Sequence, residues 1–163
     1  MSAGTPIFPI EGIALNSTGE SVADSLGSLT QSLYNANYTQ GRVYPTLAAG
    51  ATINSGAADW VLGAFATVVP ANPIAAAYHV SSVVIETCNM NAVFELVLYH
   101  GDADTLISTI RFAVTGGFWG NAVYLVPSVK IAANERIRAK LASSDGTANP
   151  ATITASLVYR LLE

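Results

Sequence analysis

The sequence predicts an all-β protein, an antiparallel β-sandwich of the jelly-roll type that follows an N-terminal extended arm. From about Tyr44 onward, β-branched and aromatic residues occur in short runs separated by turn residues. Eight runs are long enough for strands, and they lie at 43–53, 60–69, 77–88, 93–100, 106–114, 121–131, 136–143 and 151–160. Irregular loops and the lack of a convincing second helix favour a sandwich over a mixed fold.

The chain is predicted to divide into an arm at residues 1–42 and a sandwich domain at residues 43–163. Two prolines in "TPIFPIEGI" favour extended chain there, which leaves Ile7, Phe8 and Ile10 available to bury. A short helix after Ser21 is predicted by the spacing of Val22, Leu26, Leu29 and Leu33. Gly27 and nearby Ser and Thr residues weaken that pattern, so a loop-like arm that orders against a partner is the alternative.

One hairpin is predicted residue by residue. If residues 100–106 form its loop, Phe94 lies opposite Phe112 and Leu96 opposite Ile110 on the core side. The same register places Glu95 opposite Arg111 on the outer side. One register therefore satisfies both faces.

A second hairpin is predicted around "SDGTANP", between the strands at 136–143 and 151–160. Its core face would consist of Ile137, Ala139 and Leu141 with Ile153, Ala155 and Leu157. Its outer face would consist of Arg136, Arg138 and Lys140 with Thr152, Thr154 and Ser156. The segments "PANPI" and "AANERI" echo one another, and in each an Ala-Asn pair is predicted to turn before a strand.

The amino-acid composition of the chain limits the kinds of molecule that it could bind. At 163 residues the chain is long enough for one domain with a core, and only 11% of its residues are charged, against about 25% in a typical soluble domain. Its surface must therefore be rich in Ala, Ser, Thr, Asn and Gly, which suits docking; a monomer with such a coat is the alternative. A net charge of −4 with scattered basic residues argues against direct nucleic-acid binding.

No membrane segment is expected, because the uncharged stretches at 60–85 and 112–129 are interrupted by proline, asparagine or glycine. The N-terminal sequence lacks the basic start and apolar run of a secretory signal, so we expect synthesis in the cytoplasm. A single cysteine, Cys88, cannot form an intramolecular disulfide.

Catalytic, metal-binding and cofactor-binding sites are not predicted. Alternation places His79 on the face of Ser81, Val83 and Ile85, and it places His100 at a strand end beside "GDADT". Neither histidine has a catalytic signature next to it, and His79, Cys88 and His100 lack the paired spacings of zinc sites. Asp and Gly in "GDADT" are typical of a turn. Glu86 and Glu95 do not suggest a glycosidase pair, since Glu95 has a predicted partner in Arg111.

Phe118 and Trp119 lie between glycines in "TGGFWGN". Either they fold back and cap the sandwich, or they form an exposed aromatic contact for a partner or a sugar.

Several segments together resemble a β-sandwich family of tailed-bacteriophage virion proteins. The segments are "DWVLGAFATVVPANPI", "VIET" followed by "FELVLYHG", "ISTIRF", "IAANERIRAKLASSDG" and "ATITASLVYR". They span Asp59 to Arg160, and their motifs are strand and turn patterns that bring no ligand or catalytic residue with them. Such modules include capsid decoration (cement) proteins and head-fibre or tail-associated proteins.

The resemblance implies a non-enzymatic virion protein that decorates and stabilises a capsid from its outer surface, with the major capsid protein and copies of itself, in a trimer, as partners. Many copies on a lattice gain stability through repeated, weakly polar interfaces. Candidate interface residues are Ile7, Phe8, Ile10, Phe118 and Trp119. The alternative is an adhesion module on a fibre or tail that binds a host-surface glycan or receptor.

Overall fold

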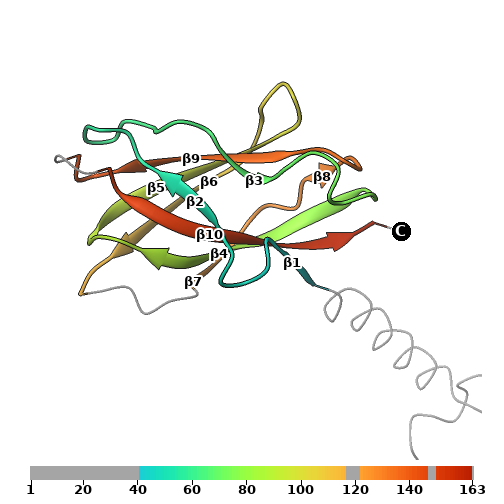
Figure 1. Cartoon of the computed structure of the whole chain (residues 1–163), viewed down its shortest axis with the longest axis horizontal. Coiled ribbons are helices and arrows are strands. Elements are labelled where there is room, and N and C mark those ends of the chain that lie inside the picture. The colour runs from blue at the N-terminus through green and yellow to red at the C-terminus, as the bar shows by residue number, and fades with distance from the viewer. Residues whose placement is uncertain (1–40, 117–121, 147–149, 163) are drawn as a thin grey trace, which may run out of the picture. The chain divides into compact units, whose positions relative to one another are not determined.

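The computed structural model describes residues 41–116, 122–146 and 150–162, which form two antiparallel sheets packed face to face (Figure 1). The strands are β1 (Arg42–Tyr44), β2 (Ala51–Asn54), β3 (Ala66–Val69), β4 (Tyr78–Cys88), β5 (Ala92–His100), β6 (Thr105–Val114), β7 (Ala122–Leu125), β8 (Lys130–Ile131), β9 (Ile137–Ser143) and β10 (Thr152–Leu161). Within the described residues, no helix is long and apolar enough to cross a membrane.

The strand order is that of a jelly roll, which confirms the predicted fold class. One sheet has the order β1-β10-β4-β7, with β2 also beside β10 and β8 also beside β4. The other sheet has the order β3-β9-β5-β6. Apart from β1 to β2, β5 to β6 and β7 to β8, the connections pass from one sheet to the other, as two interleaved Greek keys require.

Three predicted strands are shorter than expected. The run at 43–53 divides into β1 and β2, and the run at 121–131 divides into β7 and β8, where Pro127 has no N–H to offer a ladder. In the run at 60–69 only β3 is a strand, because Trp60 has a φ of 58°, which extended chain does not allow. Residues 56–65 therefore form a long loop.

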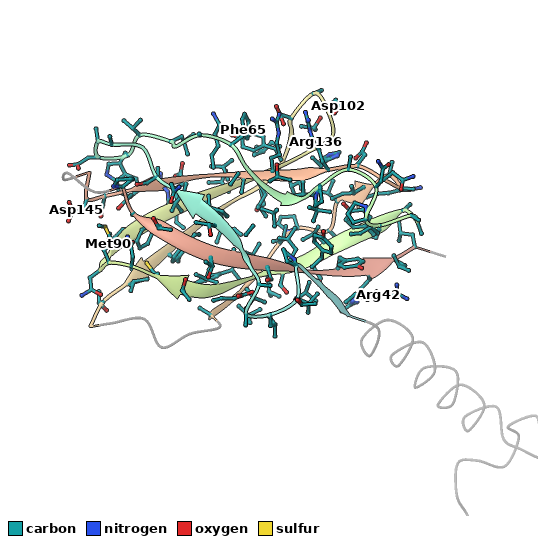
Figure 2. All side chains as sticks on the ribbon, viewed as in Figure 1. Arg42, Phe65, Met90, Asp102, Arg136 and Asp145 are labelled. Carbon is teal, nitrogen blue, oxygen red and sulfur yellow. The ribbon has the colours of Figure 1, made fainter. Side chains whose placement is uncertain are left out.

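The core lies between the sheets, where side chains from both inner faces interdigitate (Figure 2). Fully buried side chains come from nearly every strand, and they include Ile53, Val68, Tyr78, Ile85, Phe94, Leu96, Leu98, Ile131, Ile137, Leu141, Ile153 and Leu157. Burial of each large aliphatic side chain contributes about 2 kcal/mol to stability.

The predicted β5–β6 register is confirmed from Ala92 to Leu98; a bulge then shifts the pairing by one residue at Tyr99 and His100, so the loop is shorter than predicted. Phe94 lies opposite Phe112 and Leu96 opposite Ile110, and the two phenyl rings stack with centroids 5.1 Å apart. On the outer side, Arg111 Nε donates to Glu95 Oε2 at 2.6 Å. A short turn joins the two strands, with Gly101 and Asp104 at positive φ.

The predicted hairpin of β9 with β10 is wrong. β9 pairs with β3 and β5, whereas β10 pairs with β1, β2 and β4 in the other sheet. The predicted inner residues of both strands are nevertheless buried, because each strand turns its apolar face toward the shared core. They face one another across the sandwich, since alternation reveals which side of a strand is buried and not which strand lies beside it.

The predicted face of His79 is also wrong, because β4 contains a bulge. Tyr78 and Val80 point into the core, and so do Val83 and Ile85. Ser81 has no opposite residue in the ladder with β10, and this extra residue reverses the alternation. His79 therefore lies on the outer side of the sheet, whereas Val83 and Ile85 face the core. A second irregularity leaves Glu86 without an opposite residue in the ladder of β4 with β10.

The two Ala-Asn turns form as predicted, and they lie side by side. Asn72 and Asn134 have φ values of 75° and 64°, a conformation that asparagine tolerates better than most residues. The Asn72 amide donates to the Asn134 carbonyl oxygen at 3.1 Å, and the Asn134 amide donates to the Ile74 carbonyl oxygen at 2.8 Å.

Candidate functional site

The predicted interface residues Ile7, Phe8, Ile10, Phe118 and Trp119 lie outside the described residues. Their roles stay predictions.

The histidines and the cysteine do not come together. His100 ends β5, and its Nδ1 lies 2.8 Å from Glu135 Oε2. His79 belongs to the other sheet, and its buried Nδ1 has no hydrogen-bond partner among the described residues. Burial raises the pKa of the Cys88 thiol, whose Sγ donates to the Met90 carbonyl oxygen at 3.2 Å. Across residues 41–116, 122–146 and 150–162, no three His, Cys, Asp or Glu side chains form a group that could hold a metal ion.

Glu86 and Glu95 belong to different sheets and have different partners. The Glu86 carboxylate accepts hydrogen bonds from the Ala48 amide at 3.0 Å, from the Gly50 amide at 3.3 Å and from the Ser156 hydroxyl. It thereby fastens the loop between β1 and β2 to the sheet. Glu95 forms an ion pair with Arg111, so neither carboxylate is placed as part of an acid–base pair.

The outer side of sheet β3-β9-β5-β6 carries a cluster of rings and cations, which we call the aromatic face. It comprises Trp60, Phe65, Tyr99, Arg111, Arg138 and Lys140. Figure 2 shows Phe65 on this side of the sandwich.

The loop of residues 56–65 supplies both exposed rings. It runs along β9, where the Trp60 amide donates to the Ser143 carbonyl oxygen at 2.7 Å and the Gly63 amide donates to the Leu141 carbonyl oxygen at 2.8 Å. A side chain at position 63 would collide with the Asn54 carbonyl oxygen, so glycine is required there. The loop therefore lies close against the sandwich.

Cations surround the rings of the aromatic face. The Arg138 guanidinium carbon lies 4.1 Å and Lys140 Nζ 4.2 Å from the Phe65 ring centroid. The Tyr99 ring meets Phe65 edge-on, with centroids 5.3 Å apart. Arg111 lies 5.5 Å from the Trp60 ring centroid. Each contact of this kind contributes about 0.5–1 kcal/mol at an exposed site.

Carboxylates neutralise two of these cations. Arg138 Nε donates to Asp104 Oδ1 at 2.8 Å, and its Nη2 donates to Asp104 Oδ2. This pairing lowers the pKa of Asp104, with smaller contributions from Arg136 and Lys140, and it raises the pKa of Arg138. Lys140 forms no ion pair with any described residue. The three cations of the aromatic face outnumber Glu95 and Asp104 by one, on a chain whose net charge is −4.

The outer side of sheet β1-β10-β4-β7 differs in its chemistry. Two rows of side chains cross β10, β4 and β7 in register, and they are Ser156–Val84–Val123 and Val158–Ser82–Leu125. None of the six is charged, and we call this group the uncharged face. Leu125 is 85% exposed and Val123 is 58% exposed.

Both ends of the uncharged face are polar. At one end the next row is Arg160–His79–Lys130. At the other end lies a hollow of about 410 Å³ lined by Leu47, Ala48, Gly50, Glu86, Thr87 and Thr154. Val123 and Leu125 are the exposed apolar side chains of the uncharged face, whereas Ser82, Val84 and Ser156 are buried within it. An exposed apolar area with polar borders is the composition of many protein interfaces.

Sequence reasoning identified the outward direction of Arg138 and Lys140, and it missed the rings above them. Trp60 and Phe65 lay inside the predicted strand at 60–69, where they would have been part of a sheet. Gly63 between them was the available signal, because a glycine inside an apparent strand often marks a close backbone approach.

Comparison with known proteins gives distant similarities only. No family model and no curated protein matches the chain. Among solved structures, the insecticidal delta-endotoxin Cry8Ea1 from Bacillus thuringiensis is 11% identical with a TM-score of 0.42, over 69% of this chain and 19% of the toxin chain. A chain of infectious bursal disease virus, Gx strain, is 19% identical with a TM-score of 0.35, over 73% of this chain and 32% of the viral one. A chain of the T13 particle of the same virus is 20% identical with a TM-score of 0.31, over 74% and 31%. The chain thus spans between about a fifth and a third of these proteins.

Proposed function

We propose that the chain is a structural virion protein that docks on the outer surface of a bacteriophage capsid through the uncharged face and stabilises the capsid. The observation that carries the proposal is the exposed apolar end of the two uncharged rows, Val123 and Leu125 on β7. A sequence resemblance to tailed-bacteriophage virion proteins also supports it.

The energetics of such docking are favourable. Burial of the exposed Val123 and Leu125 side chains would contribute about 25 cal/mol per Å² of apolar surface. No charged group of the face would lose its hydration, so the desolvation cost of buried ions does not arise. The exposed Val123 side chain, which is β-branched, also loses little conformational freedom on contact.

The partner in this proposal is the major capsid protein, and the docked form is a homotrimer on the capsid surface. Three copies around a lattice axis would each contribute a small contact, and their sum would hold the trimer in place. Ile7, Phe8 and Ile10 stay predicted additional contacts. This role needs neither catalysis nor a cofactor.

The proposal is tested with emptied capsids of the phage and the purified full chain. We expect cosedimentation at micromolar protein and capsids that resist heating better once coated. Leu125→Ser should weaken binding by about tenfold, because Leu125 is the most exposed apolar side chain of the face.

The matched control is Leu106→Ser. Leu106 is 56% exposed on β6, in the other sheet, so its loss should leave docking unchanged. Absence of binding, or an equal loss in both variants, would contradict the proposal.

Adhesion to a host-surface glycan is a second candidate function. The specific observation in its favour is that Trp60 and Phe65 expose their rings on the aromatic face, opposite to the docking surface.

A further inference from the structure

Two rings on the aromatic face are exposed although an apolar core is available nearby. Trp60 is 47% exposed and Phe65 is 37% exposed. Both belong to the loop of residues 56–65, which the amides of Trp60 and Gly63 tie to β9. The rings are therefore held at the surface by backbone hydrogen bonds.

Holding Trp60 in this position has a conformational cost. Its φ of 58° lies in the left-handed region, where a bulky residue is strained. The Ser143 carbonyl oxygen and the turn from Ala58 to Val61 keep the backbone in this conformation. Strained residues of this type cluster at active sites and ligand-binding sites, where the surrounding structure holds a side chain in position for its ligand.

The cations beside the rings favour a negatively charged ligand. Arg111 and Arg138 are already paired with Glu95 and Asp104, so they act mainly by positioning the rings. Lys140 contacts only the Phe65 ring among these groups and forms no ion pair within the described residues. Its ammonium group is thus available for a carboxylate or sulfate of a ligand bound against Phe65.

We propose that the aromatic face binds an acidic oligosaccharide. The apolar C–H faces of its sugar rings would lie against Trp60 and Phe65, and a uronic-acid carboxylate would pair with Lys140. This inference deepens the adhesion role, which it rests on, and it is independent of the docking role of the uncharged face.

Two other ligand classes fit the face less well. A nucleic acid depends on several cations that each contact a phosphate, whereas Arg111 and Arg138 are already paired with Glu95 and Asp104 on a chain of net charge −4. An extended peptide binds by adding a strand to a sheet edge, whereas this surface is the face of a sheet and offers few free backbone groups. A short acidic sugar needs only ring contacts and one cation.

Calorimetric titration of the full chain tests the proposal, with tetragalacturonate as the acidic probe. The neutral probe is cellotetraose, and the acidic peptide probe is tetraglutamate. We expect tetragalacturonate to bind at least fivefold more tightly than either, and we expect its affinity to fall as NaCl is raised from 50 to 300 mM.

Variants locate the site. Lys140→Gln should weaken tetragalacturonate binding by about fivefold, and Trp60→Ala by about tenfold. Lys130→Gln is the matched control, because Lys130 is an exposed lysine on β8 in the other sheet. It should bind as the wild type does. Circular dichroism shows whether each variant is folded, and Lys140→Gln remains informative if Trp60→Ala is unstable.

Four results would overturn the proposal. They are no binding of tetragalacturonate at millimolar concentration, equal binding of cellotetraose, equal binding of tetraglutamate, and an equal loss in Lys130→Gln and Lys140→Gln. Leu125→Ser, the docking variant, should keep full oligosaccharide binding. The failure of this proposal is thereby distinguishable from the failure of the docking proposal.

Discussion

The two outer faces of the sandwich handle charge in opposite ways. On the aromatic face, cations and carboxylates pair at the surface, and rings lie among them. On the uncharged face, the six central residues carry no charge, and the nearby Glu86 carboxylate is turned onto backbone amides and Ser156. The carboxylates of the aromatic face pair with arginines at the surface, whereas the carboxylate beside the uncharged face holds the loop between β1 and β2 in place.

The largest stability difference should follow from Glu86→Ala. The change would leave the amides of Ala48 and Gly50 and the fully buried Ser156 without their acceptor. We expect the free energy of unfolding to fall by about 2 kcal/mol, as measured by urea denaturation.

Glu86→Gln is the control for this prediction. Its side-chain carbonyl can still accept one or two of these hydrogen bonds, so it should lose clearly less stability than the alanine variant. Lost hydrogen bonds of this kind should cost clearly more than about 0.5 kcal/mol. If the free energies of unfolding of Glu86→Ala and the wild type differed by less than this, the carboxylate would not hold the loop.

Asp104→Asn should have a smaller effect that depends on pH. Because Arg138 lowers the pKa of folded Asp104, the pair stabilises the protein above the unfolded pKa of about 4, and this contribution is lost as pH falls through the folded value. The difference in melting temperature between wild type and variant should therefore be greatest near pH 7 and should close below pH 4. A difference that stays constant between pH 7 and pH 3 would refute this explanation.

Glu95→Ala should have the smallest effect. Its partner Arg111 is 70% exposed, and exposed ion pairs of this kind contribute about 0.5 kcal/mol. Arg111 also keeps its contact with the Trp60 ring. A loss as large as that of Glu86→Ala, again measured with urea, would remove the contrast between the two faces.

Local pattern was sufficient to predict much of the fold. The alternation and the loop length between β5 and β6 together predicted Phe94 opposite Phe112 and Glu95 opposite Arg111. The Ala-Asn pairs predicted two turns, since asparagine adopts positive φ readily. These features depend on neighbouring residues in the chain, and a sequence displays such neighbours directly.

The candidate surfaces were less predictable, because each one combines distant segments. Leu125 on β7 and Val158 on β10 are far apart in the sequence. They share a row only because both lie beside Ser82 of β4. Trp60 reaches Arg111 across two strands of the sheet. No local pattern contains these relationships.

By itself the sequence determined which side of most strands is buried, because apolar residues at every second position must face a core wherever the strand lies. It also determined the tight hairpin and the asparagine turns. Only the tertiary structure decided that β9 and β10 belong to different sheets, that Ser81 and Glu86 interrupt the ladder of β4, and that charge gathers on one outer face and lies only at the borders of the uncharged rows on the other. Strand partners and bulges are set by closure of the whole sandwich, where all backbone groups and all apolar faces must be satisfied together.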